Sequence, residues 1–154
     1  MKRKIRIIAR KVLRRGAEPD VSFVPPLARR RLSQLQKAFF ALARMEGAPR
    51  PANVVFASRH GEDSLTRKIV AEYNSSGAVS PRDFSSSVYN AAPGAWSVYA
   101  GNRAPYTAVA AGPDTLRCAN IEALGMDEGP VLLVYAEEAG GCRGFSVLFD
   151  FADA

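Results

Sequence analysis

Residues 80–138 read SPRDFSSSVYNAAPGAWSVYAGNRAPYTAVAAGPDTLRCANIEALGMDEGPVLLVYAEE and contain two apolar runs on either side of a helix. The runs, residues 106–111 and 131–135, have the length of buried strands. Residues 112–114 (GPD) turn the chain into the helix, with proline near the first helical position, where its missing N–H costs nothing. Residues 125–130 hold two glycines and a proline, which end that helix. We therefore expect a strand, a tight bend, a helix and a second strand, in this order.

Another helix is predicted ahead of the first apolar run. Asp83 is a suitable N-cap residue, and Phe84, Val88 and Tyr89 follow it as apolar positions of that helix. Residues 93–94 are proline and glycine, and we expect them to break or kink it.

The N-terminal third combines a clear helix with an ambiguous segment. Residues 27–45 repeat apolar side chains at helical spacing, and Ser33 falls inside this predicted helix. Residues 2–15 (KRKIRIIARKVLRR) alternate apolar and basic positions as a strand does, but they also fit a helical stripe. The helical alternative would be a short basic amphipathic helix suited to an anionic surface.

The remaining pattern alternates strands with helices. Residues 53–58 are a candidate buried strand, and Asp63 or Ser64 caps the helix that follows. Residues 145–151 alternate apolar and polar side chains, which is typical of a half-buried strand. The sequence thus predicts one α/β domain over residues 1–154, with a mostly parallel mixed sheet and helices packed on it.

Composition narrows the class of protein. The chain has 154 residues, of which 47% are hydrophobic, and this suits one domain with its own core. No apolar stretch reaches the ~18 residues that a membrane span needs, and the basic N-terminus lacks the apolar segment of a secretory signal. Cys118 and Cys142 make neither a disulfide framework nor a metal-ligand pattern, so we expect reduced thiols, a cytoplasmic protein and no metal or cofactor.

Charge is unevenly placed along the chain. Residues 1–50 carry a net charge of +11 and the remaining residues −5, which gives the overall +6. The basic segment 1–19 and the arginines after it can attract an acidic partner. The sequence has no zinc-finger, RNP or clear helix-turn-helix pattern, so nucleic acid is not the expected partner.

The motifs in this order resemble the N-terminal half of the β-ketoacyl synthases, enzymes of the thiolase fold. The similarity is closest to the short β-ketoacyl synthase-like N-terminal family of bacterial polyketide, fatty-acid-like and aryl polyene gene clusters, and it runs from about residue 20 to residue 138. The matching positions are Phe23–Pro26, Arg29–Ser33, Val55–Ser58, Ser80-Pro81, Phe84, Ser87-Val88, Asn90, Gly94, Trp96-Ser97, Gly101–Arg103, Pro105, Thr107-Ala108 and Ala110–Gly112.

The resemblance implies a site that this chain lacks. In catalytic relatives a cysteine at the strand-to-helix corner takes an acyl chain from acyl carrier protein, and two histidines of the second half assist. Gly112 occupies the expected nucleophile position, and Cys118 lies six positions later in the helix. His60 is the single histidine and belongs to another loop, where a surface role is the ordinary one. We therefore expect no catalytic residues in this chain on its own.

A chain-length-factor-like role follows from the resemblance. The implied partners are a full-length ketosynthase, paired as a heterodimer across a sheet edge, and acyl carrier protein; a homodimer is the alternative. Arg29, Arg30 and Arg31 are candidates for docking the carrier protein. The candidate interface or tunnel residues are Asn90, Trp96, Tyr106, Thr107, Val109 and Gly112.

Two other functions remain open from sequence. An acyltransferase, hydrolase or decarboxylase could use Cys118 or a site shared with a partner. A basic binding module for nucleic acid or a membrane surface could use the N-terminal segment.

Overall fold

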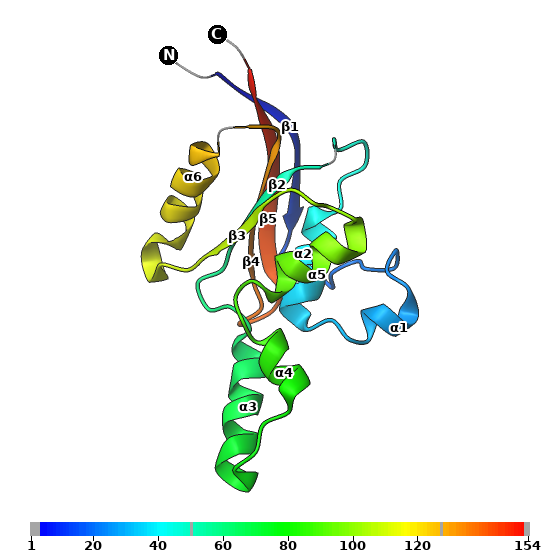
Figure 1. Ribbon diagram of the computed structural model, residues 1–154, viewed down its shortest axis with the longest axis vertical. Helices are drawn as coiled ribbons and strands as arrows, with labels where there is room; N and C mark the ends of the chain where they lie inside the picture. Colours follow the sequence, from blue (N-terminus) through cyan, green and yellow to red (C-terminus); the bar gives the residue numbers. More distant parts are fainter. Residues whose placement is uncertain (1–3, 50, 127, 153–154) are drawn as a thin grey trace.

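The computed structural model describes residues 4–49, 51–126 and 128–152. A five-stranded mixed sheet with the order β1-β5-β4-β2-β3 forms its centre (Figure 1). The strands are β1 (Lys4–Leu13), β2 (Asn53–Ala57), β3 (Tyr106–Val109), β4 (Val131–Glu137) and β5 (Arg143–Ala152). Strands β2, β3 and β4 pair in parallel, whereas β5 pairs antiparallel with both β4 and β1. The predicted α/β class with a mixed sheet is confirmed, but two of the four described strand pairings are parallel and two antiparallel, so the sheet is less parallel than expected.

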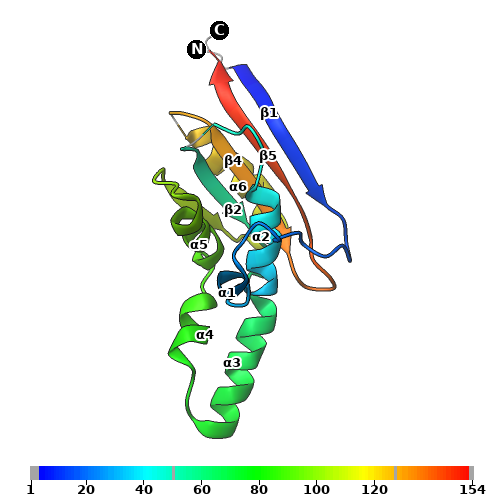
Figure 2. The same cartoon turned by 90° about the vertical axis from the view of Figure 1, so that its right-hand side faces the viewer.

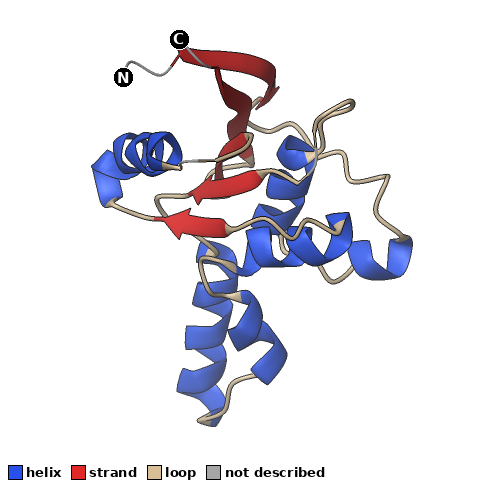
Figure 3. Cartoon of the chain, turned by 45° about the horizontal axis from the view of Figure 1, so that its top comes forward, coloured by secondary structure: helices blue, strands red, loops and turns tan. Residues whose placement is uncertain are grey.

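The helices divide between the two faces of the sheet. Helices α2 (Gln34–Ala43) and α5 (Ala91–Ala100) cover one face, and α6 (Thr115–Gly125) lies on the other (Figure 3). Helix α1 (Pro26–Arg29) is a short turn ahead of α2. Helices α3 (Asp63–Ser76) and α4 (Pro81–Ser86) project together beyond the sheet and bury no residue (Figure 2).

The larger core lies between the sheet and α2. Helix α2 buries Leu35, Phe39, Phe40 and Leu42 and is covered on nearly all sides, because β1, β4, β5 and α5 all pack against it. Phe39 meets Phe56 of β2 edge-to-face, with ring centroids 5.1 Å apart. A smaller core on the other face joins α6 to the parallel strands.

The helix predicted over residues 27–45 is wrong in one respect, because it is interrupted. Ser33 is the N-cap of α2 rather than an interior residue. Its hydroxyl accepts from the Gln36 N–H at 2.9 Å, and the Gln36 side chain accepts from the Ser33 N–H. This capping box satisfies two amide groups that a helix start otherwise leaves without partners, so the helix begins afresh there.

The helix predicted from Asp83 is also corrected. Ser80, not Asp83, caps α4, and Asp83 lies in its first turn. Helix α4 stops at Ser86, and α5 then runs through Pro93 instead of breaking there. Pro93 is the third residue of α5, where a backbone N–H has no intrahelical partner to lose. Helix α3 likewise starts after Glu62, whose side chain makes no cap, rather than after Asp63 or Ser64.

The segment 2–15 forms a strand over Lys4–Leu13 and a turn begins after it, while residues 2 and 3 lie outside the described residues. The register with β5 shifts between Ile7 and Ala9, which marks a bulge. The predicted strands at 53–58, 106–111, 131–135 and 145–151 are all confirmed, with ends that differ by a few residues. Among the described residues no helix is both long and apolar enough to cross a bilayer.

Candidate functional site

The candidate site lies where the parallel strands end. Because β2, β3 and β4 run the same way, their carboxyl ends meet at one edge of the sheet. The loop after β2, the bend after β3 and the last residues of β4 therefore come together there, although they are far apart in the sequence.

The first feature is the free side of β3. Within the described residues β3 pairs only with β2, so it is an edge strand. The Pro105 carbonyl accepts from the Val54 N–H at 3.0 Å, and the Val109 carbonyl accepts from the Ser58 N–H at 3.2 Å. Since backbone groups alternate sides along a strand, the N–H and C=O groups of Tyr106 and Ala108 face outward. Such a row of unpaired groups is a template for another strand.

Helix α5 supports this edge from behind. The Tyr106 side chain, 40% exposed, lies over Gly94 of α5, where an added Cβ would stand 3.2 Å from the tyrosine oxygen. Trp96 holds α5 to α2 through an edge-to-face contact with Phe40, at 5.2 Å between ring centroids. Trp96 is only 4% exposed and therefore packs in the core, while Asn90 at the start of α5 is exposed. Thr107 and Val109 are half-buried.

The second feature is the bend between β3 and α6. Gly112 lies at this bend with a φ of +55°, and an added Cβ there would meet nothing within 4 Å. A short 3-10 turn, Gly112–Asp114, leads directly into α6. The buried Thr115 hydroxyl accepts from the Ala111 N–H at 2.9 Å and donates to the Gly112 carbonyl at 2.8 Å, which fixes the bend. The bend thus offers space at a helix start but no side chain to act as a nucleophile.

The third feature was not predicted from sequence: three buried carboxylates lie near each other. Glu62 lies in the loop between β2 and α3, Glu137 is the last residue of β4, and Glu138 follows it. Glu137 accepts hydrogen bonds from the backbone N–H groups of Arg59 and His60 and from the Ser58 hydroxyl. The signal that could have revealed this cluster was the pair of carboxylates at the end of the buried strand β4, together with a glutamate in the loop that follows β2.

Glu138 and Glu62 differ in how well they are paired. Glu138 accepts from the Ser64 N–H at 2.6 Å, at the start of α3. Glu62 is 3% exposed and accepts from the Ser33 hydroxyl at 2.8 Å through Oε1, whereas its Oε2 has no hydrogen-bond partner among the described residues. Burial raises the pKa of Glu62 from 4.5 to about 7, and the nearby Glu138 adds to the rise while Ser33 and Gln36 oppose it.

The remaining candidates lie apart from one another. The His60 side chain is exposed, and only its backbone N–H joins the carboxylate cluster. Cys118 is half-buried on α6. Cys142 lies near the start of β5, where burial and Glu138 raise the pKa of its thiol. Within the described residues no three His, Cys, Asp or Glu side chains, the three buried glutamates included, are placed so that they could hold one metal ion.

The three arginines after Pro26 lie at the far end of α1. Arg30 and Arg31 are exposed, and Arg29 is half-buried beside a hollow that Glu18 and Asp20 also line. This surface is therefore less uniformly basic than the sequence alone indicates.

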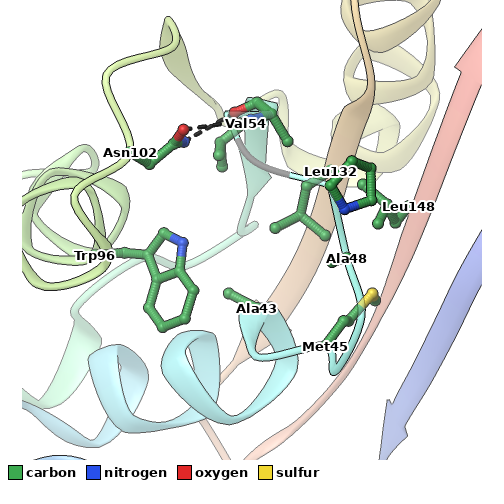
Figure 4. Close-up of a pocket in the computed structure, with 10 residues that line it drawn as sticks. Ala43, Met45, Ala48, Val54, Trp96, Asn102, Leu132 and Leu148 are labelled. Carbon is green, nitrogen blue, oxygen red and sulfur yellow. Dashed lines mark hydrogen bonds between the residues drawn. The ribbon is translucent and has the colours of Figure 1, made fainter.

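A small cavity lies behind α5 (Figure 4). It has a volume of about 20 Å³ and is lined mainly by apolar side chains, including Trp96, Met45 and Leu132. Asn102 beside it donates to the Ala52 carbonyl at 2.8 Å and accepts from the Ala52 N–H at 3.3 Å. This volume holds about one water molecule, so the cavity cannot accept an acyl chain.

Comparisons with known proteins find the same fold. The family model described as "Beta-ketoacyl synthase, N-terminal domain" matches residues 8–140. The structure of the ketosynthase ApeO in complex with its chain length factor ApeC, from Xenorhabdus doucetiae, is similar with a TM-score of 0.82 and 19% identity, over 95% of this chain and 78% of that chain. The ishigamide ketosynthase/chain length factor gives a TM-score of 0.64 and 15% identity, over 84% of this chain and 46% of that one. No curated protein matches the chain.

Proposed function

The chain belongs to the β-ketoacyl synthase N-terminal domain family, and on this basis we propose that it is a non-catalytic, chain-length-factor-like subunit that pairs with a full-length ketosynthase. The pathway would be of the fatty-acid or polyketide type. The observation that carries the proposal is the free edge of β3 with the bend at Gly112, empty of any side chain, directly after it.

Gly112 supports the non-catalytic part of the proposal. Acyl transfer through a covalent intermediate needs a nucleophilic side chain at the reacting position. The bend has the left-handed backbone and the following helix that would present one, yet glycine supplies none. Cys118 is on α6 beyond this bend and is half-buried, so it does not replace the missing group.

The edge of β3 supports the pairing. The outward N–H and C=O groups of Tyr106 and Ala108 can extend the sheet into a partner by main-chain hydrogen bonds. Thr107 and Val109 belong to this edge strand, Gly112 follows it, and Asn90 is exposed at the start of α5, the helix that packs against Tyr106 of the same strand. A subunit docked there would share the space above the bend with its partner. This shared space could limit the length of an acyl chain. Trp96 would contribute indirectly, by holding α5 in place.

The carrier-protein surface remains a proposal of its own. Arg30 and Arg31 are exposed and basic, as docking of an acidic carrier protein requires. Reversing both charges should weaken carrier binding without changing the pairing with the ketosynthase. Both cysteines are free thiols, which supports placing this assembly in the cytoplasm.

The experiment is co-expression with a full-length ketosynthase from the same genome, followed by size-exclusion chromatography. We expect the two to elute together. Ala108→Pro removes an outward N–H that β2 does not use, so the fold should persist while ketosynthase binding falls at least about tenfold. Thr107→Pro is the matched control, because it removes an N–H directed at β2 and should destabilise the fold itself.

Two results would contradict the proposal. Independent elution of the two wild-type chains would remove the pairing. A thioester on this chain after incubation with acylated carrier protein, seen by mass spectrometry and lost in Cys118→Ala, would show that the subunit is catalytic.

A further inference from the structure

Two helices form an arm that leaves the body of the molecule where the parallel strands end. Helices α3 and α4 bury no residue and project together (Figure 2). The Lys68 amino group binds the Asp83 carboxylate at 2.6 Å and joins one helix to the other. We call residues 63–86 the α3–α4 arm. Because its helices bury nothing, the position of the arm depends on how its two ends are attached.

Both ends of the arm meet at one short loop, residues 58–62, which we call the root loop. Helix α3 begins directly after Glu62. Beyond α4, the Tyr89 hydroxyl donates to the Arg59 carbonyl at 3.4 Å. The Tyr89 ring lies against Gly61, where an added Cβ would stand 3.0 Å from it. A movement of the arm against the body must therefore involve the root loop.

Carboxylates hold the root loop and the start of α3. Glu137 accepts from the backbone N–H groups at positions 59 and 60. Glu138 accepts from the Ser64 N–H at 2.6 Å. The third carboxyl, that of Glu62, belongs to the root loop itself and accepts from the Ser33 hydroxyl of α2 at 2.8 Å. Hydrogen bonds to carboxyl groups thus make up much of the attachment of the arm.

Glu62 is poorly placed to carry a charge. It is 3% exposed, and its Oε2 has no hydrogen-bond partner among the described residues. A neutral carboxyl tolerates such a position, whereas a buried carboxylate needs further hydrogen bonds or a cation. Burial raises the pKa of Glu62 to about 7, and the like charge of Glu138 adds to the rise. Ser33 and Gln36 of α2 oppose this rise by hydrogen bonding and do not cancel it.

The charged groups nearest in the chain do not neutralise Glu62. The side chains of Arg59 and His60 are exposed on the root loop. Asp63 pairs with Arg67 of α3 at 2.9 Å. Within the described residues, no cation is among the groups that shift the pKa of Glu62. An ionised Glu62 would therefore face Glu138 without a counter-charge.

We propose that the proton on Glu62 holds the α3–α4 arm in place and that loss of this proton to solvent releases the root loop. Once ionised, Glu62 lies beside a second carboxylate, Glu138. Opening of the root loop lets water reach Oε2 and separates the two charges, while the loop gives up the hydrogen bonds to Glu137 and Glu138. This device lies within one chain, so it goes beyond the proposed function and does not depend on it.

The direction of the effect follows from the two protonation equilibria. With the root loop closed, the pKa of Glu62 is about 7, whereas a solvated Glu62 in the open loop titrates at the ordinary 4.5. Between these values the closed form keeps a proton that the open form releases. The equilibrium constant for opening therefore rises with pH, by up to about 300-fold, and levels off above about pH 7.

The test is hydrogen exchange of the purified full chain, resolved by residue with NMR, between pH 4.5 and 8.5. The amides of residues 59, 60 and 64 report on the root loop, and those of residues 132–134 in β4 report on unfolding of the core. We expect the root-loop amides to exchange faster than the β4 amides at every pH, because the root loop opens without the core.

Glu62→Gln gives the decisive comparison, since wild type and variant at the same pH share the same intrinsic exchange rates. At pH 8 the root-loop amides of the wild type should exchange up to about 300 times faster than those of Glu62→Gln. At pH 4.5 the two should agree within about twofold.

Two further variants complete the test. Glu122→Gln, on the exposed side of α6, is the matched control and should follow the wild type at each pH. Glu138→Gln removes the like charge and keeps an oxygen that can accept from the Ser64 N–H. It should move the levelling-off of root-loop exchange to a lower pH, which the loss of a purely structural contact would not do.

The outcomes separate this proposal from the previous one. Equal root-loop exchange in wild type and Glu62→Gln at pH 8 overturns it. Root-loop exchange no faster than that of β4 also overturns it, because the arm would then open only when the whole chain unfolds. These measurements involve no ketosynthase. A chain that shows the pH effect but binds no ketosynthase keeps this inference and loses the proposed function, and the reverse result does the opposite.

Discussion

The Ser33 hydroxyl donates a hydrogen bond of 2.8 Å to the buried Glu62 carboxylate, and the same hydroxyl accepts from the Gln36 N–H. Ser33 is the N-cap of α2, and Glu62 immediately precedes α3. One side chain therefore joins the starts of two helices that are 29 residues apart in the sequence. The contact also brings the unpaired Oε2 of Glu62 into the interior.

This arrangement predicts a stability that falls as the pH rises. Folding raises the pKa of Glu62 from 4.5 to about 7. Between these values the folded state keeps a proton that the unfolded state releases, so the free energy of unfolding decreases with pH and levels off above about 7. The full effect is at most about 3 kcal/mol.

Glu62→Gln should remove this pH dependence, because glutamine imitates the neutral carboxyl. We expect the variant to be more stable than the wild type at pH 8 and nearly equal to it at pH 4.5, measured by urea denaturation. Glu122→Gln, on the exposed side of α6, is the control and should keep the wild-type slope. An unchanged slope in Glu62→Gln would show that another group is responsible.

The close packing around Gly144 predicts that a side chain added there is strongly destabilising. A Cβ added there would lie 2.2 Å from the Tyr135 carbonyl oxygen and 2.8 Å from Leu42 Cδ1. Both are fixed, the first by the β4–β5 ladder and the second by the core. Gly144→Ala should therefore cost about 3 kcal/mol or more in the free energy of unfolding.

Gly125→Ala provides the comparison for this substitution. Gly125 ends α6, has an ordinary φ and has nothing within 4 Å of an added Cβ. Alanine there should be neutral or stabilise by up to about 1 kcal/mol. Chemical denaturation of both variants under one condition measures the contrast, and similar values for the two would contradict the packing argument.

The hydrogen bonds of Asn102 allow a prediction of how much the free energy of unfolding falls when two buried backbone groups lose their partners. Its amide binds both the N–H and the carbonyl of Ala52, and the side chain is nearly buried. Asn102→Ala should lower the free energy of unfolding by about 2–4 kcal/mol, since each unpaired group costs about 1–3 kcal/mol. Asn74→Ala, on exposed α3, should change stability little. Equal losses of stability in Asn102→Ala and Asn74→Ala would show that the two hydrogen bonds from Asn102 to Ala52 contribute little to stability.

The open space around Gly112 predicts that a side chain introduced at this bend by substitution would be exposed and reactive. The added Cβ of Gly112→Cys meets no neighbour, and only the φ of +55° opposes it, at a cost of about 1–2 kcal/mol. The start of α6 should lower the pKa of the new thiol. In a Cys118→Ser background, we expect iodoacetamide to label Cys at this position faster than it labels Cys142, whose pKa is raised.

The measurement is the rate of alkylation of each thiol against pH, followed by mass spectrometry. A midpoint for the new thiol at or above that of Cys142 would show that the bend does not favour a thiolate. The result bears only on the geometry of the bend, because a thiolate there does not by itself restore the two histidines that the catalytic relatives are expected to use.

Much of the fold could be read from local patterns. The strands at residues 53–57, 106–109 and 131–137 are short apolar runs between turn residues, and the glycine-proline bend after the second of them is encoded by the local sequence. The motif order was also enough to identify the family. These features are carried by residues close together in the chain, where periodicity and backbone preference act directly.

Tertiary contacts determined where some helices begin and which side chains are buried. The periodicity of residues 27–45 does not show that Ser33 restarts the helix, because that depends on its capping box and its bond to Glu62. Nor does it show that Trp96 is enclosed while Ile7 and Ile121 remain exposed, because burial depends on which elements cover a face. The sequence by itself determined the elements, the family and the glycine at the bend. Only the folded chain determined that three carboxylates share one edge of the sheet, because this depends on the order in which distant strands pair.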